Sequence, residues 1–439
     1  MAYLGRPGAT APLTAADIPD NSITAAKIVE GTITVGDIGT DAVGTDEIAD
    51  DAVTGAKIEN NPTIAGNLTV SGNTTLTGDL VPSTPLSHRN LIINGATYVA
   101  QRGTSSTDQN YQTVDRWGCN HTGAWGVTQS QETLTSGDPY DLGFRKSYKC
   151  LTTSNTSDVS HYLSTETRLE GQDIACSGWN YKSASSNITL SFWVKIAPAG
   201  TYHCQVSIYE AYWYAKEYTV VADTWTKVTM TIPGNSNLTF SNDNALGLIL
   251  YPFMTYGTNY TSSSNAEETW ITYAASGQAY ESSGSPTWMN TTNAYVEITG
   301  VQLELGSSAT PFEHRSFGDE LARCHRYYQR LESTANYNNF YAGTFTSSVG
   351  NIYNGLFPLT CHLRSSSGLA VESGGTWRSQ SGGSTDASIN APSIDGTSSK
   401  YVVALNNGGA AGGGFTDGER CPIQDAGSGT AYVAVSSEL

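Results

Sequence analysis

Branched apolar residues recur at every fifth position between residues 18 and 58, and no other feature of this sequence constrains its fold as strongly. Five residues rotate an α-helix by a net angle of about 140°, so the repeat would scatter these side chains around a helix. An odd period also sends successive side chains to opposite faces of a strand. The repeat therefore predicts short extended segments joined by turns, each presenting one side chain to a shared axis. Its members are Ile18, Ile23, Ile28, Ile33, Ile38, Val43, Ile48, Val53 and Ile58.

One apolar residue in five is too little to form a core within a single chain, whereas three chains sharing the axis would close one. We therefore predict a homotrimer whose axis is lined by Ile23, Ile28, Ile33, Ile38, Val43, Ile48, Val53 and Ile58. A monomeric pentapeptide solenoid is one alternative, but it requires small residues at alternate positions, which are present only in part. An acidic linker is the other, but it would not hold so many branched residues in phase.

The charge balance excludes several classes of partner. The chain has 22 Lys and Arg against 40 Asp and Glu, a net charge of −18, so few cations are available to displace counterions from nucleic acid or anionic lipid. We expect no nucleic-acid binding and no membrane insertion, since the sequence has no apolar run of about 18 residues. The first residues lack the apolar stretch of a signal peptide, which favours synthesis in a cytoplasm.

The cysteines argue against covalent cross-links and metal. Seven are spread along the chain without a C-x-x-C pair. An odd number at irregular spacing supports neither a disulfide framework nor a metal site. We expect buried free thiols, no metal and no cofactor.

The predicted architecture is all-β and fibrous. A trimeric β-shaft with the period-five repeat precedes a jelly-roll-like β-sandwich, one short helix and a smaller C-terminal β domain. Strands are expected at residues 90–95, 125–130, 188–196, 202–209, 217–221, 225–232, 245–252 and 294–303, and a final strand at 430–436. The predicted segments are an attachment peptide (1–16), the repeat shaft (17–60), a β-structured shaft (61–87), the sandwich (88–315), a connecting helix (316–332) and a tip domain (333–439).

The connecting helix is predicted from a capping box. Ser316 and Asp319 have the S-x-x-D spacing of a helix start. Leu321, Cys324, Tyr328 and Leu331 follow at intervals of three, four and three residues, which places them on one helical face. This pattern predicts an amphipathic helix of about fourteen residues.

Several phrases in this order resemble tailed-bacteriophage tail fibres, with the resemblance reaching to about residue 330. They are residues 1–5 (MAYLG), 67–73 (NLTVSGN), 76–78 (LTG), 90–95 (NLIING), 101–103 (QRG), 114–117 (VDRW), 298–306 (ITGVQLELG), 310–315 (TPFEHR) and 323–330 (RCHRYYQR). The last hundred residues match only in style.

The resemblance implies a virion structural protein of the tail. Its first residues, with Tyr3 and Leu4, would attach it to tail adaptor or nozzle proteins. Its distal domains would adsorb to a glycan or outer-membrane protein of the host. The sandwich resembles carbohydrate-binding modules, and the chain would form a homotrimer without a cofactor. Another trimeric virion fibre, on the head, neck or whisker, is the first alternative.

Sugar binding requires exposed aromatic rings for the apolar side of a pyranose and polar groups for its hydroxyls. At the tip, Trp377, Arg378, Asn406 and Asn407 are the candidates. In the sandwich the candidates are Trp270 and Trp213, because three consecutive aromatics at 212–214 send at least one ring out of the core of a strand. A sandwich core also needs aromatics, and Trp117, Trp193 and Trp225 are expected to lie there.

Catalysis is the minority interpretation. The sequence has neither a G-x-S-x-G nor an H-E-x-x-H motif. Its local acidic pairs are Glu166 with Glu170, Glu267 with Glu268, and Asp138 with Asp141, and surface acids on an acidic protein explain them as well as a glycosidase pair does. We expect no enzyme, with a glycan-depolymerising tailspike as the remaining alternative.

Overall fold

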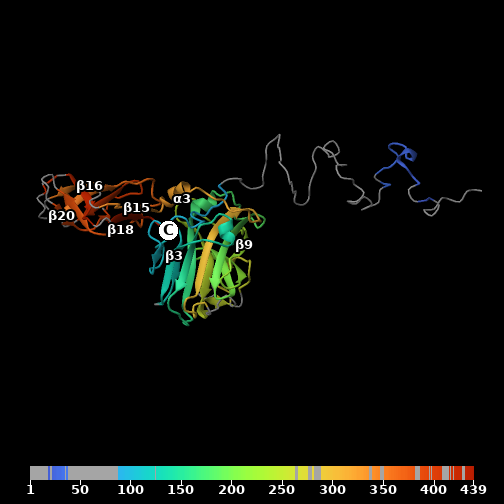
Figure 1. Cartoon of the computed structure of the whole chain (residues 1–439), viewed down its shortest axis with the longest axis horizontal. Coiled ribbons are helices and arrows are strands. Elements are labelled where there is room, and N and C mark those ends of the chain that lie inside the picture. The colour runs from blue at the N-terminus through green and yellow to red at the C-terminus, as the bar shows by residue number, and fades with distance from the viewer. Residues whose placement is uncertain are drawn as a thin grey trace, which may run out of the picture. The chain divides into compact units, whose positions relative to one another are not determined.

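The structure is a computed structural model (Figure 1). It divides the chain into two units, Met1–Leu80 and Val81–Leu439. None of the helices in the described parts is long and apolar enough to cross a membrane. The structure describes residues 18–19, 22–34, 36–37, 88–123, 125–262, 265–274, 279–280, 288–335, 339–346, 351–380, 386–394, 396, 398–407, 415, 417–418, 420–427 and 431–439.

In the first unit the repeat isoleucines that the structure describes are solvent-exposed. Ile18, Ile23, Ile28 and Ile33 are 43–55% exposed, and a 3-10 turn, η2 (Ala25–Lys27), separates two of them. Within one chain these side chains therefore form no core. The other predicted axis residues, Ile38, Val43, Ile48, Val53 and Ile58, and the predicted attachment residues Tyr3 and Leu4, lie outside the described residues. The trimeric shaft stays a prediction.

The second unit begins with a sandwich of two antiparallel six-stranded sheets. Sheet A has the order β1 (Ser105–Ser106), β3 (Val127–Thr133), β4 (Lys146–Thr152), β14 (Tyr295–Leu305), β6 (Asn187–Ala197) and β9 (Thr226–Pro233). Sheet B has the order β12 (Ile271–Thr272), β8 (Tyr212–Val220), β7 (Gly200–Ile208), β10 (Leu246–Tyr256), β5 (Tyr162–Glu170) and β2 (Gly118–His121). Along the chain, five short elements connect these strands: α1 (Asp138–Asp141), α2 (Gly171–Ala175), η4 (Thr258–Tyr260), β11 (Thr261–Ser262) and β13 (Ala279–Tyr280).

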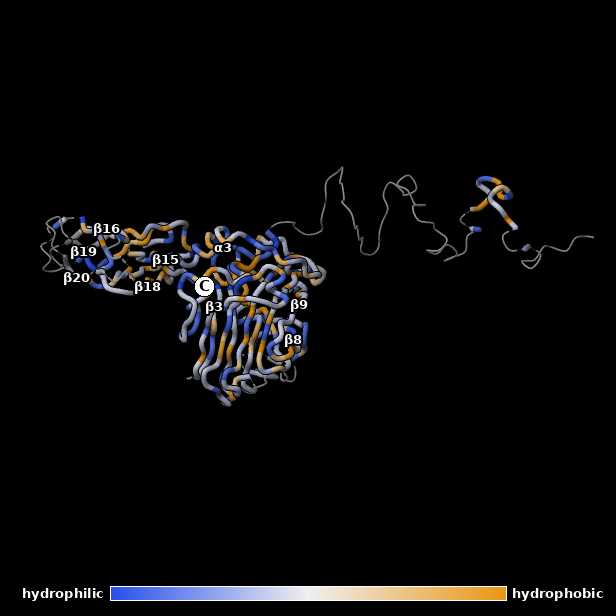
Figure 2. The backbone as a smooth tube through the Cα atoms, in the orientation of Figure 1, coloured by the Kyte–Doolittle hydropathy of each residue, from blue (hydrophilic) through white to orange (hydrophobic). Residues whose placement is uncertain are grey.

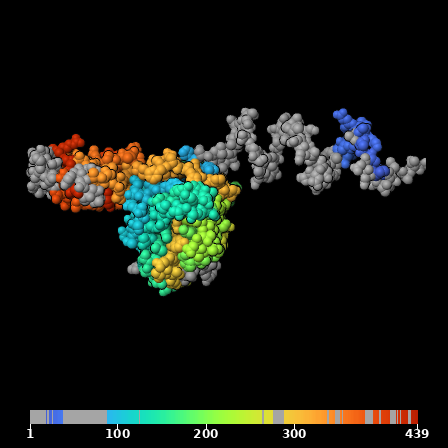
Figure 3. Space-filling view, viewed as in Figure 1, coloured from blue at the N-terminus to red at the C-terminus, as the bar shows by residue number. Residues whose placement is uncertain are grey.

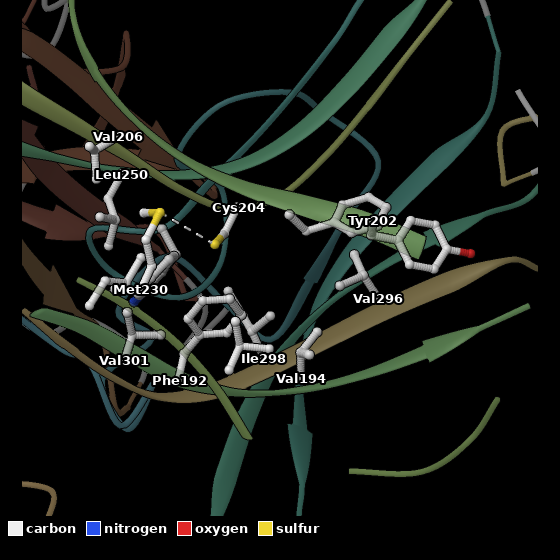
Figure 4. Packing of buried hydrophobic residues seen from close by; sticks show 14 of the residues in the cluster. Phe192, Val194, Tyr202, Cys204, Val206, Met230, Leu250, Val296, Ile298 and Val301 are labelled. Atoms are coloured by element: carbon white, nitrogen blue, oxygen red, sulfur yellow. Dashed lines mark hydrogen bonds between the residues drawn. The ribbon is translucent and has the colours of Figure 1, made fainter. Parts of the chain in front are cut away.

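The core lies between the two sheets because strands such as β6 and β9 carry apolar residues at alternate positions, and the tube of the sandwich in Figure 2 mixes apolar and polar residues along its strands. Phe192 and Ile298 of sheet A face Cys204 of sheet B (Figure 4). The Cys204 thiol lies 3.9 Å from the sulfur of Met230. Trp117 is fully buried there, as predicted. None of the seven cysteines, all of which the structure describes, forms a disulfide; five are buried, Cys176 is exposed and Cys361 is partly exposed.

Two predicted core tryptophans lie elsewhere. Trp193 and Trp225 are partly buried and pack against a separate cluster of Ala96, Leu134 and Phe144. Trp193 lies on β6 between the core residues Phe192 and Val194, so its side chain takes the outer face of sheet A. The prediction that Trp193 and Trp225 lie in the core between the sheets is therefore wrong.

The strand predicted at residues 90–95 is instead a turn. Asn94 has a φ of 57°, and its side-chain amide donates 2.8 Å hydrogen bonds to the carbonyls of Val99 and Asp115. A Cβ atom on Gly95 would lie 2.1 Å from the carbonyl oxygen of Val301, so only glycine permits this approach. The apolar run suggested a strand, but close packing against β14 decides the conformation.

The predicted helix begins as expected and ends early. The Ser316 side chain caps α3 (Phe317–Cys324) by accepting a hydrogen bond from the amide of Asp319. The helix stops at Cys324, and Tyr328 and Leu331 belong to a strand, β15 (Tyr328–Glu332). β15 pairs along its whole length with the final strand, β24 (Tyr432–Ser436). Pairing between residues about a hundred positions apart thus overrides the helical spacing of residues 328–331.

The remaining strands form the C-terminal module, which we define as residues 328–439. Its three-stranded sheet has the order β15, β24 and β18 (Ala370–Gly374). Its own core includes Ile352, Leu363 and Val433. Its seven-stranded sheet has the order β20 (Asp386–Ile389), β19 (Trp377–Gln380), β23 (Arg420–Asp425), β16 (Asn339–Thr346), β17 (Asn351–Phe357), β22 (Val403–Asn407) and β21 (Ser393–Ile394).

The module is joined to the sandwich by polar contacts, and the two surfaces meet in Figure 3. Arg116 of the sandwich forms an ion pair with Glu438 and stacks on Tyr327, with 3.5 Å from its guanidinium carbon to the ring centroid. Arg102 likewise contacts Glu438 at 3.3 Å and covers the ring of Tyr328 at 3.7 Å. The sequence phrases QRG, VDRW and RCHRYYQR therefore contribute residues to the contact between the sandwich and the C-terminal module, which we call the joint.

Candidate functional site

A groove of about 270 Å³ lies on the outer face of sheet B. In β5 the core takes Leu163 and Leu169, so the alternate residues, Ser164, Glu166 and Arg168, face the groove. Seven aromatic side chains line it: Tyr162, Tyr209, Trp213, Tyr251, Tyr256, Tyr260 and Tyr273. The other lining residues are mostly polar: Asn120, Ser164, Glu166, Arg168, Gln205, Ser207 and Glu210, with Ile249 and Met254.

Strand register arranges these side chains in rows across the sheet. Tyr251 of β10 pairs with Gln205 of β7, which pairs in turn with Ala215 of β8. On one side of this central row, Met254 of β10 pairs with Ser164 of β5 and with His203 of β7.

On the other side, Arg168, Ile249, Ser207 and Trp213 form a continuous row over four strands. Ile271 of β12 pairs with Trp213 at the end of that row. The register therefore places Gln205 between an aromatic residue, Tyr251, and a small one, Ala215, with polar residues in the rows on both sides.

A cluster of tyrosines forms one end of the groove. The ring centroids of Tyr162, Tyr256 and Tyr260 lie 5.6–5.9 Å apart, and the Tyr162 and Tyr260 rings meet edge to face. The Tyr260 hydroxyl donates a 3.0 Å hydrogen bond to the carbonyl of Ser160, and Tyr256 stacks on His203. These contacts hold the rings in place before any ligand binds.

The opposite end is open to solvent. Tyr209 is 60% exposed and follows β7, and Glu210 beside it is also exposed. The backbone amide of Tyr273 donates a 2.9 Å hydrogen bond to the carbonyl of Ala211, which places this second aromatic residue at the same turn. Tyr209 is thus the groove residue best placed to present a ring to an incoming molecule.

One ion pair lies in the groove. Arg168 donates from Nε to Glu166 Oε1 at 2.8 Å, and its Nη2 lies 2.7 Å from the same oxygen. Burial lowers the pKa of Arg168, but the Glu166 carboxylate outweighs burial, so the pKa stays above its usual value. Burial, together with the Glu166 charge, raises the pKa of Tyr251 well above its usual value. These tyrosine and arginine side chains therefore keep their protons, and both act as donors.

Gln205 lies at the centre of the floor. It is 4% exposed, and its side-chain oxygen, Oε1, has no hydrogen-bond partner. Buried polar atoms in proteins are nearly always paired, so an unpaired acceptor in a groove marks a place for a ligand donor. The structure describes no group of three or more His, Cys, Asp or Glu side chains suited to a metal ion.

The structure brings one of the two predicted sandwich tryptophans to this groove. Trp213 lines it but is only 1% exposed, so it forms part of the floor, while Tyr212 and Tyr214 pack with the core, as strand alternation predicted. Trp270 does not line the groove. It packs against Tyr214 at 5.4 Å and donates its indole N–H to the carbonyl of Pro233 at 2.8 Å, so its role is structural.

The predicted tip site is not formed. Trp377 is buried in the core of the C-terminal module, 4.9 Å from the ring of Phe340, because its side of β19 faces that core. It therefore presents no stacking face to solvent. Asn407 is also buried: its side chain accepts from the Tyr341 hydroxyl at 2.7 Å and donates to the carbonyl of Asn390 at 2.9 Å.

The other two tip candidates are partly exposed. Arg378 donates a hydrogen bond to the side chain of Gln424 at 3.0 Å. Asn406 lies in a different strand, β22, next to the buried Asn407. Without the Trp377 ring these two polar side chains make no aromatic sugar platform. The structure therefore does not bring these four residues together as the exposed recognition site that the sequence predicts.

Sequence reasoning missed most of the groove. Gln205, Tyr251 and the tyrosine cluster were not singled out, and of the predicted acids only Glu166 lines the site. The signal was present in β5, where Tyr162, Ser164, Glu166 and Arg168 alternate with core residues. Polar residues at every second strand position indicate an outer face, but only the neighbouring strands show that this face is hollow.

No family model matches this chain, and no curated protein matches it. Solved structures with partial likeness include the enzymatically active domain of tailspike protein 4 of bacteriophage CBA120, with 12% identity and a TM-score of 0.27 over 49% of this chain and 21% of that one. The family 11 carbohydrate-binding module of Clostridium thermocellum, in complex with a β-1,3-1,4-mixed-linked tetrasaccharide, has 14% identity and a TM-score of 0.23 over 48% and 98% of the two chains. A cyclase from Fischerella sp. TAU has 8% identity and a TM-score of 0.28 over 52% and 98%. At these TM-scores the likenesses do not establish a shared fold or function.

Proposed function

We propose that this protein is a fibre of a bacteriophage virion and that the groove on sheet B binds a glycan of the host surface. The observation that carries the proposal is the composition of the groove, which seven aromatic side chains line together with two carboxylates, two amides and two serine hydroxyls. Aromatic faces match the apolar side of a sugar ring, and the polar groups between them match its hydroxyls. The resemblance to tail fibres supplies the virion setting.

We propose binding without cleavage. Glycoside hydrolysis requires two carboxyl groups on either side of the scissile bond. Of the predicted acidic pairs, Glu170 is buried beneath Arg326, and Asp138 and Asp141 are exposed on α1. Glu268 pairs with Lys216 at 3.1 Å. None of these pairs places both its members in the groove, whose two carboxylates are Glu166, held in an ion pair by Arg168, and the exposed Glu210.

The assembly is part of the same proposal. Exposed isoleucines in phase along the first unit require partner surfaces, and two further copies of this chain would supply them around one axis. We place the attachment to the tail at the first residues, with Tyr3 and Leu4. The receptor-binding part would then be the second unit.

Mutation of a rim aromatic tests the binding site. Tyr209→Ala removes a ring that is 60% exposed, and we expect binding of the purified protein to host cells to fall at least about tenfold. Tyr401→Ala is the matched control, because Tyr401 is a 54% exposed tyrosine of the C-terminal module. Loss of binding in the control alone would move recognition to that module. Size analysis of host polysaccharide after incubation separates binding from cleavage.

Labelling the protein on intact particles tests the setting. Antibody-gold microscopy with the second unit as antigen should mark the tail. Label confined to the head or neck would favour another kind of virion fibre.

A further inference from the structure

Two side chains on the floor of the groove, Gln205 and Glu166, carry hydrogen-bond acceptors. Gln205 Oε1 is buried without a partner, and the Glu166 side chain, 4% exposed, contacts Arg168 through Oε1. From these groups we infer that the groove selects an uncharged glycan that presents a vicinal diol to Gln205. This inference rests on the proposed function and names the class of sugar that the same site would take.

The amide of Gln205 is suited to a pair of neighbouring hydroxyls. Its oxygen accepts one hydrogen bond and its nitrogen donates another, so one hydroxyl of a diol can donate to Oε1 while the next accepts from Nε2. Gln205 lies on a central strand, with Tyr251 on one side and Ala215 on the other. Ala215 is fully buried on that side and its side chain is only a methyl group, so that side chain cannot satisfy Gln205 in place of a ligand.

The charges that line the groove disfavour an acidic sugar. Arg168 is the only lysine or arginine among the described lining residues. Its Nε and Nη2 contact Glu166, and its Nη1 donates to the carbonyl oxygen of Leu439 at 2.7 Å. A carboxylate or phosphate on the ligand would meet Glu166, Glu210 and the Gln205 oxygen, while the one cation is already engaged.

A cationic sugar is also disfavoured at the floor. The Glu166 carboxylate is compensated by Arg168, which lies next to it along β5. An ammonium group placed there would lie close to the guanidinium. A neutral ligand satisfies Gln205 and leaves the ion pair intact, which is the arrangement with the fewest unpaired groups.

A glycan array probed with the full chain tests the class of ligand. It should carry neutral, acidic and amino-sugar glycans, and we expect hits among the neutral ones alone. Binding to uronic acid or phosphorylated glycans with equal affinity would overturn the inference but leave glycan binding intact, and so would a preference for amino sugars. Absence of binding to every class would count against the proposed function itself.

Periodate then tests the diol. Mild oxidation cleaves the bond between two hydroxyl-bearing carbons, converting both to aldehydes, and borohydride reduces these to separate alcohols. We expect a treated neutral ligand to lose at least about tenfold in affinity. Undiminished binding after complete oxidation would contradict recognition of a vicinal diol.

Two variants at one position separate recognition from folding. Gln205→Leu removes both polar atoms, and we expect affinity for the neutral ligand to fall at least about tenfold while the melting temperature is unchanged or higher, because a buried unpaired acceptor is removed. Gln205→Glu should also lose affinity, since it replaces the donor by a second acceptor. A Gln205→Leu protein that melts lower and binds normally would show that Gln205 is structural.

Discussion

Arg326 donates two hydrogen bonds of 2.7 Å to the carboxylate of Glu170, one to each oxygen, across 156 positions of the chain. The Tyr327 hydroxyl donates a third, of 2.6 Å, to Glu170 Oε1. Glu170 is the last residue of β5 and its side chain is fully buried, so this contact fastens the two residues that directly precede β15, the first strand of the C-terminal module, to the end of a sandwich strand. The phrase RCHRYYQR, which suggested a fibre, acts here as a structural joint.

Removing the cation should destabilise this joint. Arg326→Gln leaves the Glu170 carboxylate buried without its bidentate partner. Breaking a fully buried pair costs about 3–5 kcal/mol, and because the Arg326 side chain is 35% exposed we expect a loss of about 2 kcal/mol, measured by chemical unfolding. Glu332→Gln is the control, since Glu332 is 58% exposed in its pair with Arg330 and should change stability by less than about 0.5 kcal/mol. Equal losses would refute the assignment.

The same contact should make stability depend on pH. Burial raises the pKa of Glu170, but the hydrogen bonds from Arg326 and Tyr327 outweigh it and hold the pKa below its ordinary value of 4.5. A lowered pKa in the folded state gives stability that is present above pH 4.5 and lost as the pH falls through the folded value. Melting temperatures measured from neutral to acid pH should therefore drop. In Glu170→Gln that part of the drop should be missing; an identical pH profile in the variant would assign the effect to other groups.

The turn at residues 90–95 should not tolerate a side chain at its glycine. A Cβ on Gly95 would lie 2.1 Å from the Val301 oxygen, so Gly95→Ala must displace the backbone of β14 or of the turn, and we expect a loss of about 3 kcal/mol. Gly318→Ala, in α3, meets nothing within 4 Å and should leave stability unchanged or raise it by about 0.5–1 kcal/mol. Thermal unfolding of the two variants compares them directly, and similar melting temperatures would argue against a tight approach at Gly95.

The trimer axis can be tested by placing a charged residue either at positions of the five-residue repeat or at a position outside it. Ile28→Asp with Ile33→Asp would bury carboxylates at the proposed shared axis, at a cost of several kcal/mol per site, and sedimentation should show smaller assemblies. Val29→Asp is the matched control, because Val29 is 72% exposed but lies outside the five-residue period. An unchanged trimer in the double variant, or equal dissociation in the control, would rule out axial isoleucines.

Local patterns predicted much of the fold. The Ser316 capping box marked the first turn of α3, and period-two alternation located strands that the structure places at β3, β6, β7, β9, β10 and β14. Strands with many polar residues, such as β4 and β5, were missed. Their outer faces bear polar side chains that resemble loop composition until the neighbouring strands are known.

The candidate site could be predicted only in part. Trp213 was identified because strand alternation forces one of three consecutive aromatics outward. The Ser- and Gly-rich surroundings of Trp377 suggest exposure, whereas its side chain faces the core of the C-terminal module and packs on Phe340. Gln205 carried no signal, since an isolated glutamine in a strand is unremarkable until Tyr251 and Ala215 are placed beside it.

The sequence by itself determined the all-β character, the start of α3 and the phase of the isoleucine repeat, because each depends on residues within a few positions of one another. Only the tertiary structure decided that residues 328–332 pair with β24 instead of continuing a helix, that residues 90–95 turn, and that a groove lies on sheet B. These features depend on groups tens to hundreds of positions apart. Their free energies arise from burial and hydrogen bonding that exist only once the distant strands have met.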